Sequence, residues 1–259
     1  MIRFDDGVAY ERAMGLWSRP VGEVFLDWLA PPPGLRWLDV GCGNGAFTEL
    51  LMQRCVPAEA QGVDPSEGQL SFARTRPGAR GAHFRQGDAM ALPFDADSFD
   101  AAAMALVIFF VPEPARGIAE MARVVRPGGL VATYAWDFSS GGFPWAVVQE
   151  EVRAIGLTHP LPPSVGVEQL DSLRDLWSGA GLGEIEIRQI TVQRRFADTA
   201  DFWETVAGTA TLREVLANLP PGDLVRLKER VAARLRIDGS GAVTHTATAN
   251  AIKGRVPAR

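Results

Sequence analysis

The sequence predicts an α/β fold built on a mostly parallel sheet, and three observations predict it. A short apolar segment, Trp37–Val40, has the character of a buried strand and runs directly into glycines at alternate positions, Gly41, Gly43 and Gly45. Apolar residues then recur at helical spacing from Phe47. Further strand-like segments follow at intervals along the chain. They are 60–63, a segment from His83 that ends in Asp88, 99–106, 130–136 after a tight turn at 126–129, 184–196 with an irregularity near Gln189, and 242–252.

The glycine-rich segment indicates a binding site for a nucleoside-type cofactor. Glycine has no side chain, so a strand that turns through glycine into a helix lets a ligand approach bare backbone. The free N–H groups at the start of the helix also favour an electron-rich partner. Gly41, Gly43 and Ala46 satisfy the G-x-G-x-x-G/A dinucleotide pattern as well. From these residues alone, a nicotinamide- or flavin-dependent oxidoreductase stays open.

Two acidic residues at strand ends narrow the chemistry of this site. Asp64 follows the predicted strand 60–63, where a carboxylate can accept hydrogen bonds from ribose hydroxyls. Asp88 ends the next strand and is placed to accept a hydrogen bond from an exocyclic adenine amine. An acid at the exit of an apolar strand needs a polar partner, and a bound nucleoside supplies one.

Five stretches occur together, in order, within residues 36–136. They are Leu38-Asp39-Val40-Gly41-Cys42-Gly43-Asn44-Gly45, Gly62-Val63-Asp64-Pro65-Ser66, Gln86-Gly87-Asp88-Ala89 with Leu92-Pro93-Phe94, Phe99-Asp100, and Arg123-Val124-Val125-Arg126-Pro127-Gly128-Gly129. In these stretches the chain resembles the class I S-adenosylmethionine-dependent methyltransferases. It is most similar to the small-molecule group related to the ubiquinone and menaquinone C-methyltransferases, which carry the methyltransferase type 11 domain.

The resemblance implies a Rossmann-like class I methyltransferase fold. We therefore expect a seven-stranded, mostly parallel sheet with an antiparallel last strand, helices on both faces and a helical lid. The chain is expected to form a single domain, 1–259. Within it lie N-terminal helices in 1–35, a cofactor-binding core in 36–136, and the lid, expected to contain three helices, as an insertion in 198–237 between the last two strands.

The resemblance also implies S-adenosylmethionine as cofactor, S-adenosylhomocysteine as product, and a set of binding residues. Gly41, Cys42 and Gly43 would line the methionine moiety, and Asp64 would hold the ribose hydroxyls. For the adenine, Pro65 would flank the ring, Asp88 would accept a hydrogen bond from its amine, and the Ala89 N–H would bind a ring nitrogen. Leu106 would lie beside the sulfonium, and Tyr10 would close over the cofactor.

Aromatic residues gather in the segments predicted to cover this site. We expect them to form a pocket for an apolar or aromatic small molecule; they are Trp136, Phe138, Phe143, Trp145, Phe202 and Trp203. Methyl transfer needs mainly alignment and desolvation of its two partners, so no catalytic residue is predicted. Of three histidines, only His159 is expected in the covering region, as a solvent-facing loop residue; His245 is assigned to the antiparallel edge.

Composition restricts the alternatives. The net charge of −5 disfavours a nucleic-acid partner, whose phosphates require a basic surface. There is no apolar run long enough for a membrane span and no signal-peptide core, and the two cysteines indicate neither a disulfide framework nor a metal site. We expect a cytoplasmic protein, a monomer or homodimer, acting on a small-molecule acceptor. A non-catalytic cofactor-binding module is the second rival to methyl transfer.

Overall fold

The computed structural model describes residues 14–209 and 212–258. Its eight strands, all in one sheet, are β1 Arg36–Val40, β2 Glu59–Asp64, β3 His83–Gln86, β4 Phe99–Ala105, β5 Val125–Trp136, β6 Gly183–Phe196, β7 Arg236–Ile237 and β8 Val243–Arg255. The helices described in these ranges are α2 Leu16–Leu29, α3 Ala46–Cys55, α4 Glu67–Ala73, α5 Pro114–Val124, α6 Ala146–Ala154, α7 Leu170–Gly179, α8 Thr199–Ala207, α9 Arg213–Ala217 and α10 Pro221–Ala232, with the short 3₁₀ turns η2 Pro77–Ala79 and η3 Ile108–Phe110.

The sheet has the order β3-β2-β1-β4-β5-β8-β6, with the two-residue β7 beside β8. Strands β1 to β5 pair in parallel, whereas β8 is antiparallel to both of its long neighbours. The predicted seven-stranded sheet with an antiparallel last strand is therefore confirmed. Strand β8 lies between β5 and β6, so it is not the edge strand that the sequence suggested.

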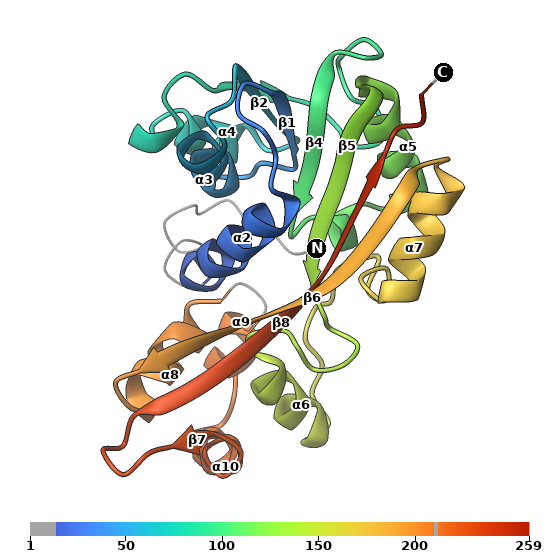
Figure 1. The fold of residues 1–259 in the computed structure, drawn as a ribbon. Coiled ribbons are helices and arrows are strands. Elements are labelled where there is room, and N and C mark those ends of the chain that lie inside the picture. Colours follow the sequence, from blue (N-terminus) through green and yellow to red (C-terminus); the bar gives the residue numbers. More distant parts are fainter. Residues whose placement is uncertain (1–13, 210–211, 259) are drawn as a thin grey trace.

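Helices cover both faces of the sheet (Figure 1). On one face the Phe25 ring of α2 contacts Tyr134 of β5, with ring centroids 4.6 Å apart. On the other face the Trp177 indole of α7 donates to the Val131 carbonyl at 3.1 Å and packs beside Gly254. Val131 and Tyr134 point to opposite faces because side chains alternate along a strand. The sheet is thus buried on both sides, which explains the apolar runs of its central strands.

Strand β6 changes its buried face half-way along, and this corrects one prediction. The sequence suggested an irregularity near Gln189, but Gln189 pairs regularly with Asn250, and the register shift lies between Gly183 and Glu186. The first half of β6 turns Ile187 to the face that α7 covers. From Ile190 onward the buried side chains lie on the opposite face, the one that α2 covers. A change of covering helix, rather than a bulge, breaks the apolar alternation.

The segment from Arg126 to Gly129 also differs from expectation. The sequence predicted a tight turn before a strand at 130–136, whereas β5 runs continuously from Val125. Gly128 has a positive φ of +75° and donates its N–H to the Val256 carbonyl at 2.7 Å. The end of β8 therefore keeps these residues in the ladder.

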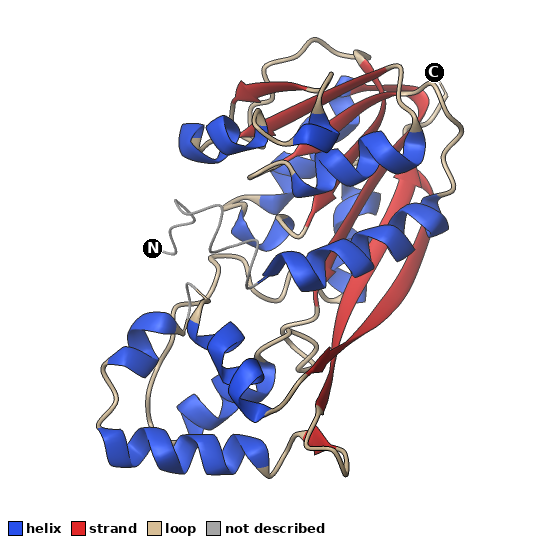
Figure 2. Ribbon diagram, turned by 90° about the vertical axis from the view of Figure 1, so that its left-hand side faces the viewer, coloured by secondary structure: helices blue, strands red, loops and turns tan. Residues whose placement is uncertain are grey.

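A helical lobe, made of α6, α8, α9 and α10, lies beyond the carboxyl ends of β4 and β5 (Figures 1 and 2). Strand β5 ends where Trp136 pairs with Ala249, but β6 and β8 continue and carry the chain into the lobe. Buried Glu151 of α6 accepts from Arg230 and Arg234, which ties α10 to α6. The three helices predicted in 198–237 are thus present, and their action as a lid stays a prediction.

Residues 1–13 lie outside the described part of the chain, so of the helices expected in 1–35 only α2 is seen. Within the described residues, no helix is both long enough and apolar enough to cross a membrane.

Candidate functional site

The residues expected to bind the cofactor lie at the carboxyl ends of four neighbouring strands. The glycine-rich loop, residues 41–45, follows β1, and Asp64 ends β2. Asp88 follows β3, and Leu106 follows β4. Because these strands are adjacent in the order β3-β2-β1-β4, their ends form one continuous edge. Ligands of open α/β sheets bind at such an edge.

The glycine-rich loop has a conformation that favours glycine. Gly41, Gly43 and Gly45 all have positive φ, at +73°, +51° and +79°. The N–H groups of Gly41 and Cys42 both donate to the Val63 carbonyl, at 2.7 and 3.0 Å, which fixes the loop over β2. A Cβ on Gly41 would lie 2.5 Å from Cγ1 of Val107, so the loop and the exit of β4 are in direct contact.

The Asp64 carboxylate holds this loop from the side. Its Oδ2 accepts from the Gly43 N–H at 3.0 Å, and its Oδ1 accepts from the Ser66 N–H at 2.9 Å. Burial raises the pKa of Asp64, while the two backbone N–H groups oppose that rise. Each carboxylate oxygen can accept more than one hydrogen bond, so both remain able to accept from ribose hydroxyls.

The ends of β2 and β3 are joined by backbone contacts. Gly87 donates its N–H to the Asp64 carbonyl at 3.2 Å, and the Gln86 amide donates to the carbonyl of the exposed Pro65 at 2.9 Å. Asp88 is exposed, and its Oδ1 accepts the Met90 N–H at 2.8 Å. These contacts hold the ends of β2 and β3 together, with both Pro65 and Asp88 exposed.

Leu106 and Val107 form the wall of the site at the end of β4. Leu106 is buried, and its φ of +60° is a strained value for a residue with a side chain. Its N–H donates to the Tyr134 carbonyl at 2.9 Å. Such outliers gather at functional sites. Val107 was missed by sequence reasoning, because only the fold shows that its side chain limits the space beside Gly41.

Asp39 is a buried carboxylate on β1, two residues before the glycine-rich loop. It is 1% exposed, and its Oδ2 accepts from the Thr48 hydroxyl at 2.6 Å, while Oδ1 has no partner within the described residues. Burial is the main cause that raises its pKa to about 7, and the Thr48 hydroxyl opposes this. Asp39 thus connects β1 to α3 through Thr48, whose hydroxyl and backbone N–H both favour the charged carboxylate.

The stability of the apo-protein should fall as pH rises because of Asp39. A carboxyl with a raised folded pKa stabilises the fold below the unfolded value of 3.8, and loses this contribution up to about pH 7. The full loss is about 4 kcal/mol. We expect Asp39→Asn, which keeps an acceptor for Thr48, to remove it. In urea unfolding, the stability difference between variant and parent should grow by about 2–3 kcal/mol from pH 5 to pH 8. Parallel pH profiles would contradict this.

Several other predicted positions need correction or lie outside the structure. His159 is buried rather than solvent-facing: its Nε2 lies 3.2 Å from Nη1 of Arg153, and burial lowers its pKa. Cys42 is buried, and burial raises its thiol pKa well above the usual value, consistent with a space-filling role. Tyr10 lies outside the described residues.

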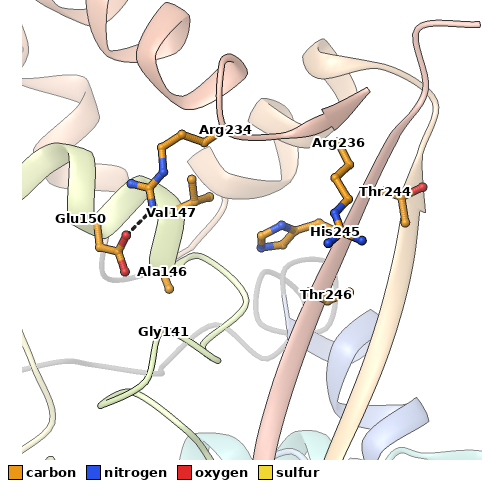
Figure 3. A pocket seen from close by; sticks show the side chains of 9 residues that line it. All are labelled: Gly141, Ala146, Val147, Glu150, Arg234, Arg236, Thr244, His245 and Thr246. Atoms are coloured by element: carbon orange, nitrogen blue, oxygen red, sulfur yellow. Dashed lines mark hydrogen bonds and ion pairs between the residues drawn. The ribbon is translucent and has the colours of Figure 1, made fainter. Parts of the chain in front are cut away.

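The six aromatic residues expected to line a pocket are largely packed against one another. Phe138 stacks on Phe143 with ring centroids 4.7 Å apart, and Trp145 meets Phe202 edge-on at 5.9 Å. None of the six lines the cavity of about 240 Å³ that lies in the helical lobe (Figure 3). That cavity is polar, and it is lined by Gly141, Ala146, Val147, Glu150, Arg234, Arg236, Thr244, His245 and Thr246. The described residues contain no cluster of three side chains suited to holding a metal ion.

Comparison with known proteins identifies the domain to which this edge belongs. Residues 38–133 match the family described as "Methyltransferase domain". This stretch contains the glycine-rich loop, Asp64, Asp88 and Leu106, the residues that the fold brings to one edge. Residues 38–133 therefore carry a methyltransferase domain. Its sheet order, with antiparallel β8 inserted between β5 and β6, also departs from the 3-2-1-4-5-6 order of dinucleotide-binding oxidoreductases.

Relatives of this methyltransferase domain match it over part of their length. The chain is 40% identical over 129 residues to a malonyl-[acyl-carrier protein] O-methyltransferase of Methylococcus capsulatus, covering 48% of this chain and 46% of that protein. It is 39% identical over 111 residues to the ubiquinone/menaquinone biosynthesis C-methyltransferase UbiE of Dinoroseobacter shibae, covering 41% and 44%. The chain thus spans under half the length of these two relatives.

The fold itself extends over nearly the whole chain. A solved structure of phosphoethanolamine N-methyltransferase 2 from Haemonchus contortus, in complex with phosphomonomethylethanolamine and S-adenosylhomocysteine, superimposes with a TM-score of 0.61. It is 19% identical in sequence and covers 98% of this chain and 58% of that one. At this identity, the likeness concerns the fold alone.

Proposed function

We propose that this chain transfers a methyl group from S-adenosylmethionine to a small molecule with an apolar or aromatic body. The observation that carries the proposal is the continuous edge formed by the glycine-rich loop, Asp64, the Asp88–Ala89 turn and Leu106. It offers a glycine-rich backbone for the methionine moiety, a carboxylate that could accept from ribose hydroxyls, and the exposed Pro65 and Asp88 for the adenine. The supporting relatives are methyltransferases by name, one acting in ubiquinone/menaquinone biosynthesis and one on malonyl-[acyl-carrier protein].

Each described residue has a defined part in binding. Gly41, Cys42 and Gly43 would lie against the methionine moiety, where the two glycines, both at positive φ, place no side chain in its way. Asp64 would accept from the ribose hydroxyls. Pro65 would flank the adenine, and Asp88 and the Ala89 N–H would receive its polar edge. Tyr10, which lies outside the described residues, keeps its predicted role of closing the site.

When bound, the cofactor supplies an electrophilic methyl group on a sulfonium. The protein then has to hold the acceptor in line and exclude water. Leu106, Val107 and Ile108 suit this task, because their side chains form an apolar wall at the end of β4. Since this wall brings no proton acceptor, an acceptor with its own nucleophilic atom fits the site best.

The proposal is tested by calorimetric titration with S-adenosylmethionine, S-adenosylhomocysteine and NADH. We expect micromolar binding of the two sulfur nucleosides and none of NADH. Asp88→Ala should weaken both about 5- to 15-fold, since it removes one exposed hydrogen bond worth about 1–1.5 kcal/mol. The exposed Asp95→Ala, in the same loop, is the matched control.

Two results would contradict the proposal. NADH binding with no affinity for the sulfur nucleosides would favour an oxidoreductase. Tight binding of S-adenosylmethionine without transfer of a labelled methyl to any member of a library of phenols, quinols, amines and carboxylic acids would favour the non-catalytic module. The second alternative is kept because the apolar wall after β4 contains no titratable group.

A further inference from the structure

Two cross-strand neighbours, Arg194 on β6 and His245 on β8, have buried nitrogen atoms without partners. They are paired in the sheet register, so their side chains lie on the same face, about 5 Å apart at Cβ. Within the described part of the chain, neither Nη1 of Arg194 nor Nε2 of His245 makes a hydrogen bond. Buried polar groups are nearly always satisfied, so two neighbouring exceptions indicate a missing partner.

Arg194 is the sharper exception of the two, because its guanidinium stays charged. No ion pair is formed by Arg194 among the described residues, and burial lowers its pKa. Asp201 attracts it electrostatically, but Oδ2 of Asp201 accepts the Ala197 N–H at 2.9 Å and forms no salt bridge with Arg194. The guanidinium instead lies over the Phe196 ring, 4.3 Å from its centroid. A partly buried cation that lies over a ring and forms no salt bridge can bind an anion.

Aromatic rings surround this pair and offer further unused donors. His245 meets Trp17 and Phe202 edge-on, with ring centroids 5.9 and 5.8 Å apart. Trp17 in turn meets Trp145 at 5.9 Å. Both indole N–H groups are buried and have no acceptor within the described residues. The surroundings of Arg194 and His245 therefore combine a cation and N–H donors without acceptors with apolar, aromatic side chains.

The cavity in the helical lobe gives access to His245. Figure 3 shows the imidazole projecting from β8 toward α6, with the Arg236 side chain beside it. Of the two arginines in the lining, Arg234 is paired with Glu150 and Glu151, whereas Arg236 forms no ion pair among the described residues. The excess positive charge of the cavity lining favours an anionic ligand over a cationic one.

The position in the fold links this pair to the proposed methyl-transfer site. Arg194 and His245 lie where β6 and β8 continue past the last β5 pairing, Trp136 with Ala249. They therefore lie beyond the carboxyl end of β5, about 13 Å along β8 from that pairing. They face α2, whose Trp17 covers them, and α2 also contacts α3, the helix that starts at the glycine-rich loop.

We propose that the methyl acceptor carries a carboxylate, and that Arg194, flanked by His245, binds it. This inference rests on the proposed function and adds the chemical class of the acceptor: an acid with an apolar or aromatic body. Arg194 is a specificity-determining residue here, since it holds the acceptor at a point away from the methylated atom.

The first test needs no ligand. An arginine retained for binding, without an anion of its own, should cost the apo-protein stability. We expect Arg194→Met to raise the Tm by about 2–4 °C. Arg195→Met is the matched control, because Arg195 is the next residue on β6, is exposed, and forms an ion pair with Asp238 at 2.8 Å. Its Tm should stay the same or fall slightly. A Tm of Arg194→Met below that of the parent would mean that Arg194 serves the fold, and would overturn the proposal.

The second test uses 3-phenylpropionate and its uncharged amide as probes, with and without S-adenosylhomocysteine. We expect millimolar concentrations of the acid to raise the Tm of the parent and of Arg195→Met, and the amide to have no effect. Arg194→Met should lose the response to the acid, while Arg194→Lys should keep part of it. S-adenosylhomocysteine should bind Arg194→Met as it binds the parent.

The outcomes separate the two proposals. Equal effects of acid and amide, an undiminished response in Arg194→Met, or no response of the parent to the acid would overturn the carboxylate site. If S-adenosylhomocysteine does not bind the parent, the proposed function is overturned instead. The Tm measured with S-adenosylhomocysteine and without the acid shows this independently.

Discussion

Replacing Asp64 with alanine should weaken binding of S-adenosylhomocysteine at least 100-fold. In the proposed binding mode the change removes the acceptors for two ribose hydroxyls, and hydrogen bonds to a charged group contribute about 1.5–3 kcal/mol each. It also leaves the N–H groups of Gly43 and Ser66 without the carboxylate that they now share. Calorimetric titration of the parent and the variant measures the loss directly. Glu59→Ala is the control, because Glu59 is an exposed carboxylate at the other end of β2 and should leave the affinity unchanged.

Ligands that lack a ribose hydroxyl separate the two effects of Asp64. If the carboxylate binds the ribose, the 2′-deoxy and 3′-deoxy analogues of S-adenosylhomocysteine should bind the parent more weakly. On Asp64→Ala they should bind about as well as the complete ligand, because the lost interactions are the same ones. If removal of a hydroxyl costs as much on the variant as on the parent, Asp64 would only position the loop, and the assigned role would be wrong.

The parts of the fold that were predicted correctly are those determined by short-range sequence. Most residues of β1 and β4 are buried, so the apolar character of these two strands is visible in the sequence itself. The details that were wrong depend on partners distant in the chain. The turn at Gly128 joins β5 only because the end of β8 accepts its N–H, and the buried face of β6 changes because α7 and α2 cover different halves.

The same distinction holds for the candidate site. The glycine-rich loop and Asp64 lie within one strand–loop–helix–strand unit, and their chemistry is visible as a local pattern. Arg194 and His245 belong to strands joined by a long helical insertion. Only the antiparallel register makes them neighbours, and only burial shows that their nitrogen atoms lack partners among the described residues. Seen in sequence, Arg194 is one of two successive arginines on an alternating strand, and nothing there distinguishes it from the exposed Arg195.

Replacing Gly41 with alanine should destabilise the protein by about 2–5 kcal/mol. Two costs add. Its φ of +73° disfavours any residue with a Cβ, and the new Cβ would lie 2.5 and 2.7 Å from the two methyl groups of Val107. Because Val107 is branched at Cβ, no rotation about χ1 moves both of its methyl groups away from the new Cβ. Urea unfolding measures the loss, and cofactor affinity should fall with it as the loop is pushed from its place over Val63.

Two other glycines separate these costs. Gly34 has a φ of +81° and would have nothing within 4 Å of an added Cβ, and Gly43 has a φ of +51° with the nearest neighbour of such a Cβ at 4.0 Å. Alanine at either position should therefore cost only the conformational part, about 1–2 kcal/mol. Gly43→Ala should in addition lower cofactor affinity, whereas Gly34→Ala, away from the site, should not. Adding Val107→Ala to Gly41→Ala should restore part of the stability, since it removes the two methyl groups in conflict. If Gly41→Ala costs no more than Gly34→Ala, the close contact between the loop and the exit of β4 is not a constraint on the site.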